Sequence, residues 1–382
     1  MHHIKNWIRQ GMVLAVLGAS AHGCFAQEIV IGQVASMTGS NGADLGQGLQ
    51  VGLRVAIAQA NDAGGIAGRK LRLAVRDDKY IPDETVRLTQ ELLDQENPIA
   101  LSGYRGTANT ITLVKSGLLT QAAIPLVGTL TGAGELQGAA NIFHVRTSYR
   151  DEISQIVGQL SRMSASQIGL FYVDDAFGQA GRDALETALA TQGTKAAAIA
   201  AYNKAPDKVS ATIDAAVETL VAAAPQAIVM VAVGEPVYAF VKRIRTRLPA
   251  VRLVSLSVVD SGAMVSKVGI QAAHGIGFSQ VFPYPYNDTV KLVREYRAQL
   301  ARHGAGASAN YFNLEGYIGG LVLIDALRRS GPNPTRQRLL EVLNRPGEIN
   351  LDGFFLKFDP QTHNASRFTE LTVISRDGRL VR

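Results

Sequence analysis

The stretch Asn61-Asp62-Ala63-Gly64-Gly65-Ile66-Ala67-Gly68-Arg69-Lys70-Leu71 carries three glycines between two segments of different periodicity. Before it, apolar side chains in residues 45–61 recur at the spacing of an amphipathic helix. After it, residues 71–75 form a short apolar run that is typical of a buried strand, and residues 29–34 resemble that run. The order strand, helix, strand predicts a parallel sheet with helices on both faces.

The same alternation continues through most of the 382 residues. A second series of strands and helices begins after His144, and a chain of this length favours two domains. We therefore expect two similar α/β units, followed by helices near the C-terminus and a final strand pair at residues 354–358 and 371–374. The strands expected in the second unit cover residues 168–173, 196–202, 227–233 and 252–256.

The N-terminus has the three-part pattern of a secretory signal peptide. Lys5 and Arg9 precede an apolar run of residues 12–21, which is about half the length that a membrane-spanning helix needs. We expect a Sec-type signal over residues 1–26, cleavage near Ala26 and export to the periplasm. The alternative is a lipoprotein signal with Cys24 acylated, but Ala21 and His22 match the usual residues before such a cysteine poorly.

The composition excludes several classes of catalytic site. Cys24 is the only cysteine, and the chain has no nucleophile elbow, phosphate-binding Walker loop or zinc-protease histidine pair. Four histidines follow the signal segment without metal-ligand spacing. We therefore expect no enzyme, no metal and no cofactor. The formal charge of +6 is scattered, and the basic cluster of residues 242–247 is interpreted as a solvated helix face, so no nucleic-acid partner is expected.

Loops rich in glycine and small hydroxyl residues follow three of the strands expected in the first unit. Ligands of open parallel sheets bind at the carboxyl ends of strands, where helix N-termini direct N–H groups toward anions. Hydroxyl groups add adaptable donors, and glycine permits close backbone approach. The sequence therefore predicts a binding site for a small polar solute, favouring a carboxylate. The loops are residues 36–40, 102–107 and 128–132.

From about Glu28 to Ile374 the chain resembles the type I periplasmic solute-binding proteins of the branched-chain amino acid importers. The stretch of residues 61–71 quoted above is the most specific part of the resemblance. The other segments that carry it are Ile31-Gly32-Gln33 with Thr38-Gly39, Asp77-Asp78, Gly103-Tyr104-Arg105-Gly106-Thr107, Asp174-Asp175-Ala176-Phe177-Gly178 and Glu315-Gly316-Tyr317.

The resemblance implies two lobes, each a parallel sheet flanked by helices, joined by a three-strand hinge that closes on a solute. Lobe 1 would comprise residues 27–145 and 281–346, and lobe 2 residues 146–280 and 347–382. The chain would cross between lobes near residues 144–147, 278–282 and 346–352.

The resemblance also implies the residues that bind the solute. The carboxylate-binding loop of the family matches Tyr104, Gly106 and Thr107, and its next loop matches residues 130–132. An aromatic residue of lobe 2 would cover the ligand. The residues transferred in this way are Leu130, Thr131 and Gly132, then Phe177 as the aromatic cover, and Leu45 and Phe312 as the apolar wall of lobe 1.

One departure from the family changes the expected ligand. Amino-acid binders of this class place an acidic side chain after the strand that is expected to end at Leu256, whereas this chain has Ser257. Burying an unpaired ammonium group is costly, so either Glu235 or Asp260 replaces the acid, or the ligand lacks an amino group. Aromatic and aliphatic carboxylates are then the alternative ligands.

Three arginines are candidates for binding the ligand carboxylate through two hydrogen bonds. Arg105, Arg146 and Arg150 lie near the expected cleft or hinge, although an ion pair at the surface or between the lobes is the favoured interpretation of each. The expected partners are a small-molecule solute and the membrane-embedded permease of an ABC importer, with the chain itself a monomer. A ligand-sensing module of the same fold, or an enzyme built on it, would be the alternatives.

Overall fold

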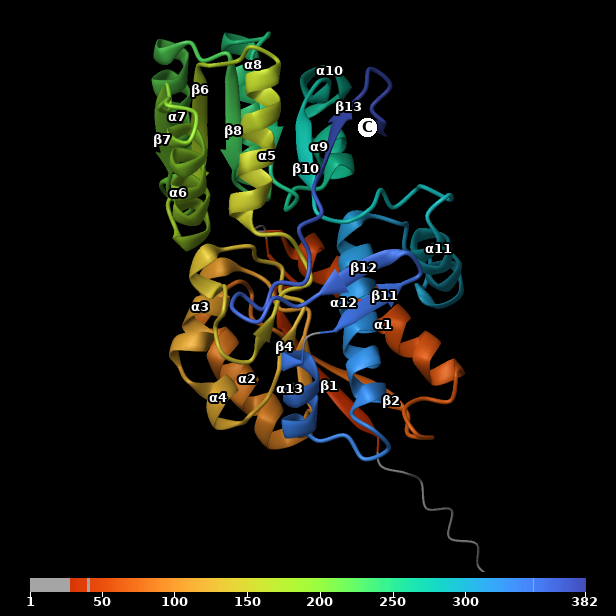
Figure 1. The fold of residues 1–382 in the computed structure, drawn as a ribbon. Coiled ribbons are helices and arrows are strands. Elements are labelled where there is room, and N and C mark those ends of the chain that lie inside the picture. The colour runs from red at the N-terminus through yellow and green to blue at the C-terminus, as the bar shows by residue number, and fades with distance from the viewer. Residues whose placement is uncertain (1–27, 40–41, 346) are drawn as a thin grey trace, which may run out of the picture.

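A computed structural model describes residues 28–39, 42–345 and 347–382. Two α/β lobes lie one above the other, with the chain passing between them at a narrow waist (Figure 1). The expectation of two lobes, each built on a largely parallel sheet, is confirmed. The expected signal segment, residues 1–26, lies outside the described residues, and none of the described helices is long and apolar enough to cross a membrane.

Lobe 1 contains a five-stranded parallel sheet in the order β2-β1-β3-β4-β5. Helix α1 packs on α12 and α2 packs on α3, so helices cover the sheet on both faces. The elements are β1 (Ile29–Ala35), α1 (Ala43–Asp62), β2 (Leu71–Asp77), α2 (Pro82–Glu96), β3 (Ala100–Ser102), α3 (Thr107–Lys115), α4 (Leu118–Gln121), β4 (Leu126–Val127), the 3-10 turn η1 (Gly134–Leu136), β5 (Ile142–Phe143), α11 (Lys291–His303), α12 (Tyr311–Arg329) and α13 (Arg336–Asn344).

Lobe 2 contains a seven-stranded sheet in the order β14-β13-β10-β9-β8-β6-β7, in which β13 and β14 pair antiparallel to their neighbours. Helix α5 packs on α6 and α7 packs on α8. The elements are α5 (Tyr149–Arg162), β6 (Ile168–Val173), α6 (Ala176–Ala190), β7 (Ala198–Tyr202), α7 (Val209–Ala223), β8 (Ala227–Val231), α8 (Glu235–Arg247), β9 (Arg252–Ser255), α9 (Ser261–Val268), α10 (Ile270–Ala273), β10 (Gly277–Gln280), β13 (Glu370–Ile374) and β14 (Leu380–Val381).

A two-stranded hairpin separates the C-terminal helices from β13. It consists of β11 (Glu348–Leu351) and β12 (Phe354–Lys357), and its apolar side chains belong to the core of lobe 1. The division expected from the sequence places these residues in lobe 2, and the strand pair expected at the C-terminus joins residues 354–358 to 371–374. In the structure β12 pairs with β11, because Phe354 and Leu356 pack beside Phe282 of the lobe 1 core.

The chain passes between the lobes after β5, after β10 and between β12 and β13. The first and third passages run side by side. The His144 amide donates to the His363 carbonyl at 2.8 Å, and the Ala365 amide donates to the His144 carbonyl at 2.8 Å. The third passage therefore lies later in the chain than the expected residues 346–352, because the hairpin adds two strands to lobe 1 first.

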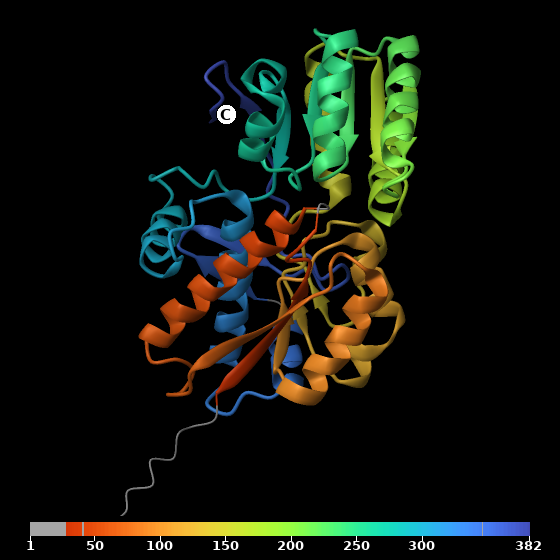
Figure 2. The same cartoon turned by 180° about the vertical axis from the view of Figure 1, so that it is seen from behind.

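Helices α1 and α12 lie against each other, as Figure 2 shows from behind, and glycines allow their close approach. A Cβ atom placed on Gly52 would overlap the carbonyl oxygen of Asn313, and one placed on Gly316 would overlap the carbonyl oxygen of Leu49. This backbone contact fixes α1 against the sheet, and the N-terminal end of α1 carries Leu45 to the face that meets lobe 2.

We expect Gly52→Ala to lower the free energy of unfolding by about 1–3 kcal/mol, because the added methyl group forces the two helix backbones apart. Gly134→Ala is the matched control. Apart from its immediate neighbours in the chain, no atom lies within 4 Å of a Cβ at Gly134, so its effect should stay within about 0.5 kcal/mol. Urea unfolding followed by far-UV circular dichroism measures both, and equal stability of the two variants would contradict the packing argument.

Candidate functional site

The loops that follow β3 and β4 are joined to each other by backbone hydrogen bonds. The Leu130 amide donates to the Tyr104 carbonyl at 2.8 Å, and the Gly106 amide donates to the Leu130 carbonyl at 3.4 Å. The hydroxyl groups of Thr107 and Thr131 lie 2.8 Å apart. The two glycine and hydroxyl loops thus form one surface at the carboxyl edge of the lobe 1 sheet.

This surface meets lobe 2 in a narrow cleft. The enclosed space is about 10 Å³, near the lower limit for holding one water molecule. The buried apolar cluster runs continuously from Leu45 and Leu130 of lobe 1 to Phe177 and Val258 of lobe 2. The lobes are therefore closed on each other. The lining residues are Leu45, Tyr80, Arg105, Gly106, Thr107 and Leu130 from lobe 1, with Tyr149, Phe177, Val233 and Val258 from lobe 2.

Arg105 supplies the positive charge in the cleft. Its side chain is 2% exposed and hydrogen-bonds the Ser36 hydroxyl, and its guanidinium lies 4.4 Å from the centre of the Tyr80 ring. Burial lowers the pKa of Arg105, while Tyr80 and Asp78 oppose that shift. An arginine remains charged in proteins under such conditions, so a buried cation faces the cleft.

Tyr80 connects the two lobes through its ring. Lys79 and Tyr80 both have positive φ, at 51° and 65°, a conformation that non-glycine residues rarely adopt and that is frequent at functional sites. The guanidinium of Arg105 stacks on this ring, and the ammonium group of Lys204 from lobe 2 lies 5.3 Å from the ring centre. Lys204 also pairs with Asp175 at 2.6 Å, so one charged contact spans the closed cleft.

Five of the eleven residues expected at the site line this cleft. They are Leu45, Gly106, Thr107, Leu130 and Phe177.

Two further expected residues support the cleft from behind. Thr131 contacts Thr107, and the Gly132 carbonyl accepts a hydrogen bond from the Tyr149 amide at 2.8 Å. Tyr149 in turn lies with its ring centre 5.3 Å from that of Phe177, edge to face.

The remaining four expected residues point elsewhere. Tyr104 is buried inside lobe 1, where its hydroxyl lies 3.0 Å from that of Thr89, and Phe312 packs against α1 at Gly48. Glu235 is exposed and pairs with Lys267 at 2.6 Å. Ser257 is bound to other side chains, as described below.

Tyr80, Tyr149, Val233 and Val258 line the cleft although the sequence did not indicate them. Tyr80 follows the paired Asp77 and Asp78 closely, so its position just after the second strand could have indicated a place at the cleft. The apolar lining residues gave no signal, because single valines after strands are ordinary in any α/β protein.

A buried ionic network lies where the first passage meets both lobes. Arg146 is fully buried and donates to Glu315 on α12 at 3.3 Å and to Glu152 on α5 at 3.4 Å. It also donates to the Ser257 hydroxyl, which itself donates to Glu152 at 3.0 Å. The network thus joins lobe 1, the hinge and lobe 2. Of the three candidate arginines, Arg146 forms ion pairs that join the two lobes, Arg150 is exposed, and Arg105 lines the cleft.

The network holds two buried carboxylates and one guanidinium. Burial, opposed by Arg146 and reinforced by Glu152, raises the pKa of Glu315 from its usual 4.5 to about 7. Burial also lowers the pKa of His144, in the adjoining passage, to about 4. His144 is therefore neutral, with its Nε2–H donating to the Leu136 carbonyl at 3.1 Å.

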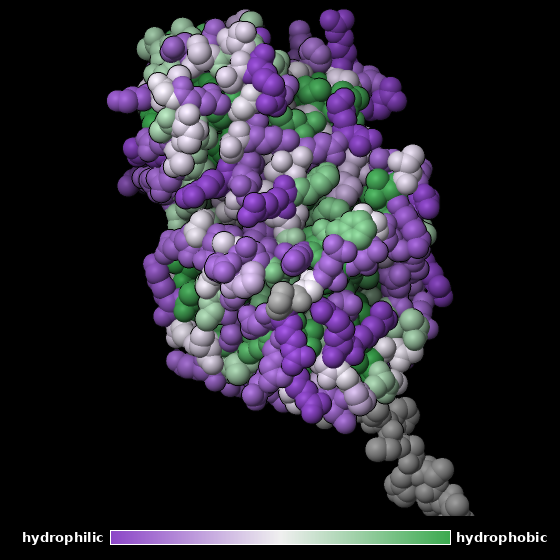
Figure 3. Space-filling model, in the orientation of Figure 1, coloured by the Kyte–Doolittle hydropathy of each residue, from purple (hydrophilic) through white to green (hydrophobic). Residues whose placement is uncertain are grey.

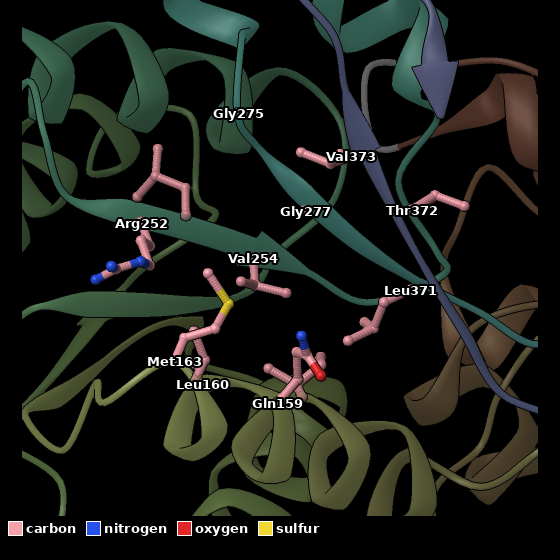
Figure 4. Close-up of a pocket in the computed structure, with 12 residues that line it drawn as sticks. Gln159, Leu160, Met163, Arg252, Val254, Gly275, Gly277, Leu371, Thr372 and Val373 are labelled. Atoms are coloured by element: carbon pink, nitrogen blue, oxygen red, sulfur yellow. The ribbon is translucent and has the colours of Figure 1, made fainter. Parts of the chain in front are cut away.

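Two of the larger hollows differ from the cleft in chemistry and position. One, of about 450 Å³, is an apolar groove between α5 and strands β9, β10 and β13 (Figure 4). It touches the first residues of β9 and β10, so it lies away from the carboxyl ends of these strands. The other, of about 900 Å³, is an opening between the lobes lined by Asp260, Tyr284, Tyr286 and Tyr311 among others.

Asp260 caps α9, where it accepts a hydrogen bond from the Ala263 amide at 2.6 Å. Its carboxylate borders the wide opening rather than the narrow cleft.

Within residues 28–39, 42–345 and 347–382, no three His, Cys, Asp or Glu side chains gather as metal ligands. On the face seen in Figure 3, hydrophilic side chains cover most of both lobes, with apolar side chains interspersed.

We expect stability to fall as the pH rises from about 4.5 to about 7, since the raised pKa of Glu315 makes the folded chain bind a proton that the unfolded chain has released. Glu315→Gln should remove most of this slope and leave Arg146 paired with Glu152. Glu341→Gln, at an exposed position on α13, is the control. Urea unfolding across this pH range measures the effect, and an unchanged slope in Glu315→Gln would refute the assignment.

Arg146→Met should lower the free energy of unfolding by about 3–5 kcal/mol, because it leaves two carboxylates buried without their cation. The exposed Arg150→Met should change stability by no more than about 0.5 kcal/mol. Chemical unfolding at neutral pH compares the two, and a small effect of Arg146→Met would show that the network contributes little to joining the lobes.

Comparisons with known proteins give matches over nearly the whole described chain. Residues 28–379 match the family described as periplasmic binding protein. An amino acid binding protein of Pseudomonas aeruginosa is 28% identical over 200 residues, which cover 50% of this chain and 52% of that protein. The match therefore spans about half the length of that relative.

Solved structures match the fold over its full extent. A substrate-binding periplasmic protein from Ralstonia solanacearum is 31% identical, with a TM-score of 0.87 over 93% of this chain and 99% of that chain. A possible leucine/isoleucine/valine-binding protein from Rhodopirellula baltica is 25% identical, with a TM-score of 0.87 over 95% of this chain and 98% of that chain. The match over residues 28–379 agrees with the two lobes, the three chain passages between them and the cleft at the strand ends. This chain belongs to the periplasmic binding protein family.

Proposed function

We propose that this chain is the solute-binding component of an ABC importer, exported to the periplasm by its N-terminal signal segment. It captures a small carboxylate between its lobes and delivers it unchanged to the membrane-embedded permease. The observation that carries the proposal is the cleft itself, where the strand-end loops of both lobes meet around the buried guanidinium of Arg105.

The chemistry of the cleft supports capture of an anion. Arginine binds a carboxylate through two parallel hydrogen bonds. Helix α3 begins at Thr107 beside it, and the N-terminal end of a helix carries partial positive charge. No catalytic constellation accompanies these groups among the described cleft residues, so binding and release is the activity that the residues support.

The size of the cleft supports a cycle of opening and closing. A space of about 10 Å³ admits no solute of amino-acid size, so the lobes must separate before one binds. A ligand that contacts both lobes then stabilises the closed state by its differential affinity. The importer would recognise that closed state, with a single copy of this chain docking transiently on the permease.

We expect carboxylates of amino-acid size to raise the melting temperature and to be recovered chemically unchanged. A ligand at 100 times its Kd should add about 2.7 kcal/mol to the free energy of unfolding. A thermal-shift screen of amino acids and of aliphatic and aromatic acids, followed by mass spectrometry of the recovered ligand, tests this. Consumption of a stabilising compound would overturn the proposal in favour of an enzyme, and a screen in which no carboxylate stabilises the protein would overturn carboxylate capture.

A further inference from the structure

We infer that the solute is an apolar monocarboxylate, aliphatic or aromatic, that carries no ammonium group on the carbon next to its carboxylate. This inference rests on the proposed function and names the ligand class of the same cleft. Three properties of the cleft carry it, namely one buried cation, the absence of an acidic side chain from its lining, and apolar walls.

The cation is already desolvated and held in place. The Arg105 guanidinium hydrogen-bonds Ser36 and stacks on Tyr80 at 4.4 Å. Asp78 and Asp44 are carboxylates whose charges act on Arg105, and Asp78 accepts hydrogen bonds from the Thr85 hydroxyl at 2.7 Å and the Asn109 amide at 3.2 Å. Neither carboxylate belongs to the lining of the cleft, so the charged side chain in that lining is a cation.

An ammonium group would lack a partner in this cleft. In an α-amino acid the nitrogen is two bonds from the carboxyl carbon, or roughly 2.5 Å away by standard bond lengths. Its anionic partner must therefore lie beside the carboxylate site. None of the ten residues that line the cleft is an aspartate or glutamate, and lobe 2 presents Val233 and Val258 there. An ammonium group next to Arg105 would be both repelled and unpaired.

Acidic groups around the cleft already serve other partners, including Asp175, which pairs with Lys204 at 2.6 Å. Asp44, at the start of α1, is exposed to water. Glu152 and Glu315 are bound to Arg146, and Ser257, at the position of the expected acid, bonds to Arg146 and Glu152. Glu235 pairs with Lys267 at the surface. Asp260, which the sequence left as a substitute, caps α9 at the wide opening.

The walls of the cleft favour an apolar ligand body. Leu45 and Leu130 face Val233 and Val258 across it, and the rings of Tyr149 and Phe177 meet edge to face at 5.3 Å. Apolar surface placed between such groups is favourable in proportion to the area removed from water. A dicarboxylate or a sugar acid would instead leave polar groups without partners.

The first experiment compares matched ligands on the unmodified protein, after unfolding and refolding to remove any bound solute. Leucine is paired with 4-methylpentanoate, and phenylalanine with 3-phenylpropanoate, so each pair differs only in the ammonium group. Calorimetry should show that at least one of the two plain acids binds at least about tenfold more tightly than its amino acid. The neutral 4-methylpentanamide should bind at least about tenfold more weakly than 4-methylpentanoate.

The outcomes separate this inference from the proposed function. If an amino acid binds as tightly as its plain acid or more tightly, the inference is wrong while carboxylate capture stands. If neither series binds, carboxylate capture fails as well.

The second experiment tests Arg105 directly. Arg105→Gln should weaken binding of the preferred acid at least about tenfold, and Arg105→Lys should weaken it less because the charge remains. Arg87→Gln, on the exposed face of α2, should leave the affinity unchanged. A melting curve of each variant reports whether it folds, and should Arg105→Gln not fold, the comparison of acid with amide on the unmodified protein decides the role of the charge. Unchanged affinity in folded Arg105→Gln would overturn that role.

Discussion

Arg146 is the charge on which the arrangement of the two lobes depends. A guanidinium taken fully out of water is costly unless anions and hydrogen-bond acceptors surround it. Here one acceptor comes from α12 in lobe 1, a second from α5 in lobe 2 and a third from the loop after β9. These elements can satisfy Arg146 only when they meet at the first passage, so the network specifies how the lobes join at the hinge.

The same network explains why residue 257 is a serine. Its hydroxyl accepts a hydrogen bond from Arg146 and donates one to Glu152, and its amide donates to Glu152 at 3.0 Å. A carboxylate at this position would add a third buried negative charge against two that share one cation. A carboxylate at position 257 is therefore incompatible with the Glu152 and Glu315 pair. Residue 257 therefore serves the charge balance of the hinge.

Sequence periodicity predicted most of the fold, because a parallel sheet with helices on both faces requires buried strands and one-sided helices in alternation. The strand-end loops located part of the cleft for the same reason, since the carboxyl ends of parallel strands meet at one edge. Tyr80 was missed because its position depends on left-handed backbone conformations at Lys79 and Tyr80, which the local residue preferences do not predict. The hairpin of β11 and β12 was misplaced because its packing against Phe282 is a contact between distant parts of the chain. Ser257 was seen correctly as a departure, but its partners Arg146 and Glu152 became visible only in three dimensions.

In the proposed function, the place where groups lose their water links closure of the lobes to the choice of ligand. Arg105 has already lost most of its water in the folded chain, and the Tyr80 ring and the Ser36 hydroxyl keep it oriented. For the proposed carboxylate, a guanidinium that is already held in place would require little additional ordering. Closing the lobes then removes the rest of the ligand from water, which favours an apolar body and disfavours any further charge. In the proposed function, the residues that shut the cleft would therefore also select the solute.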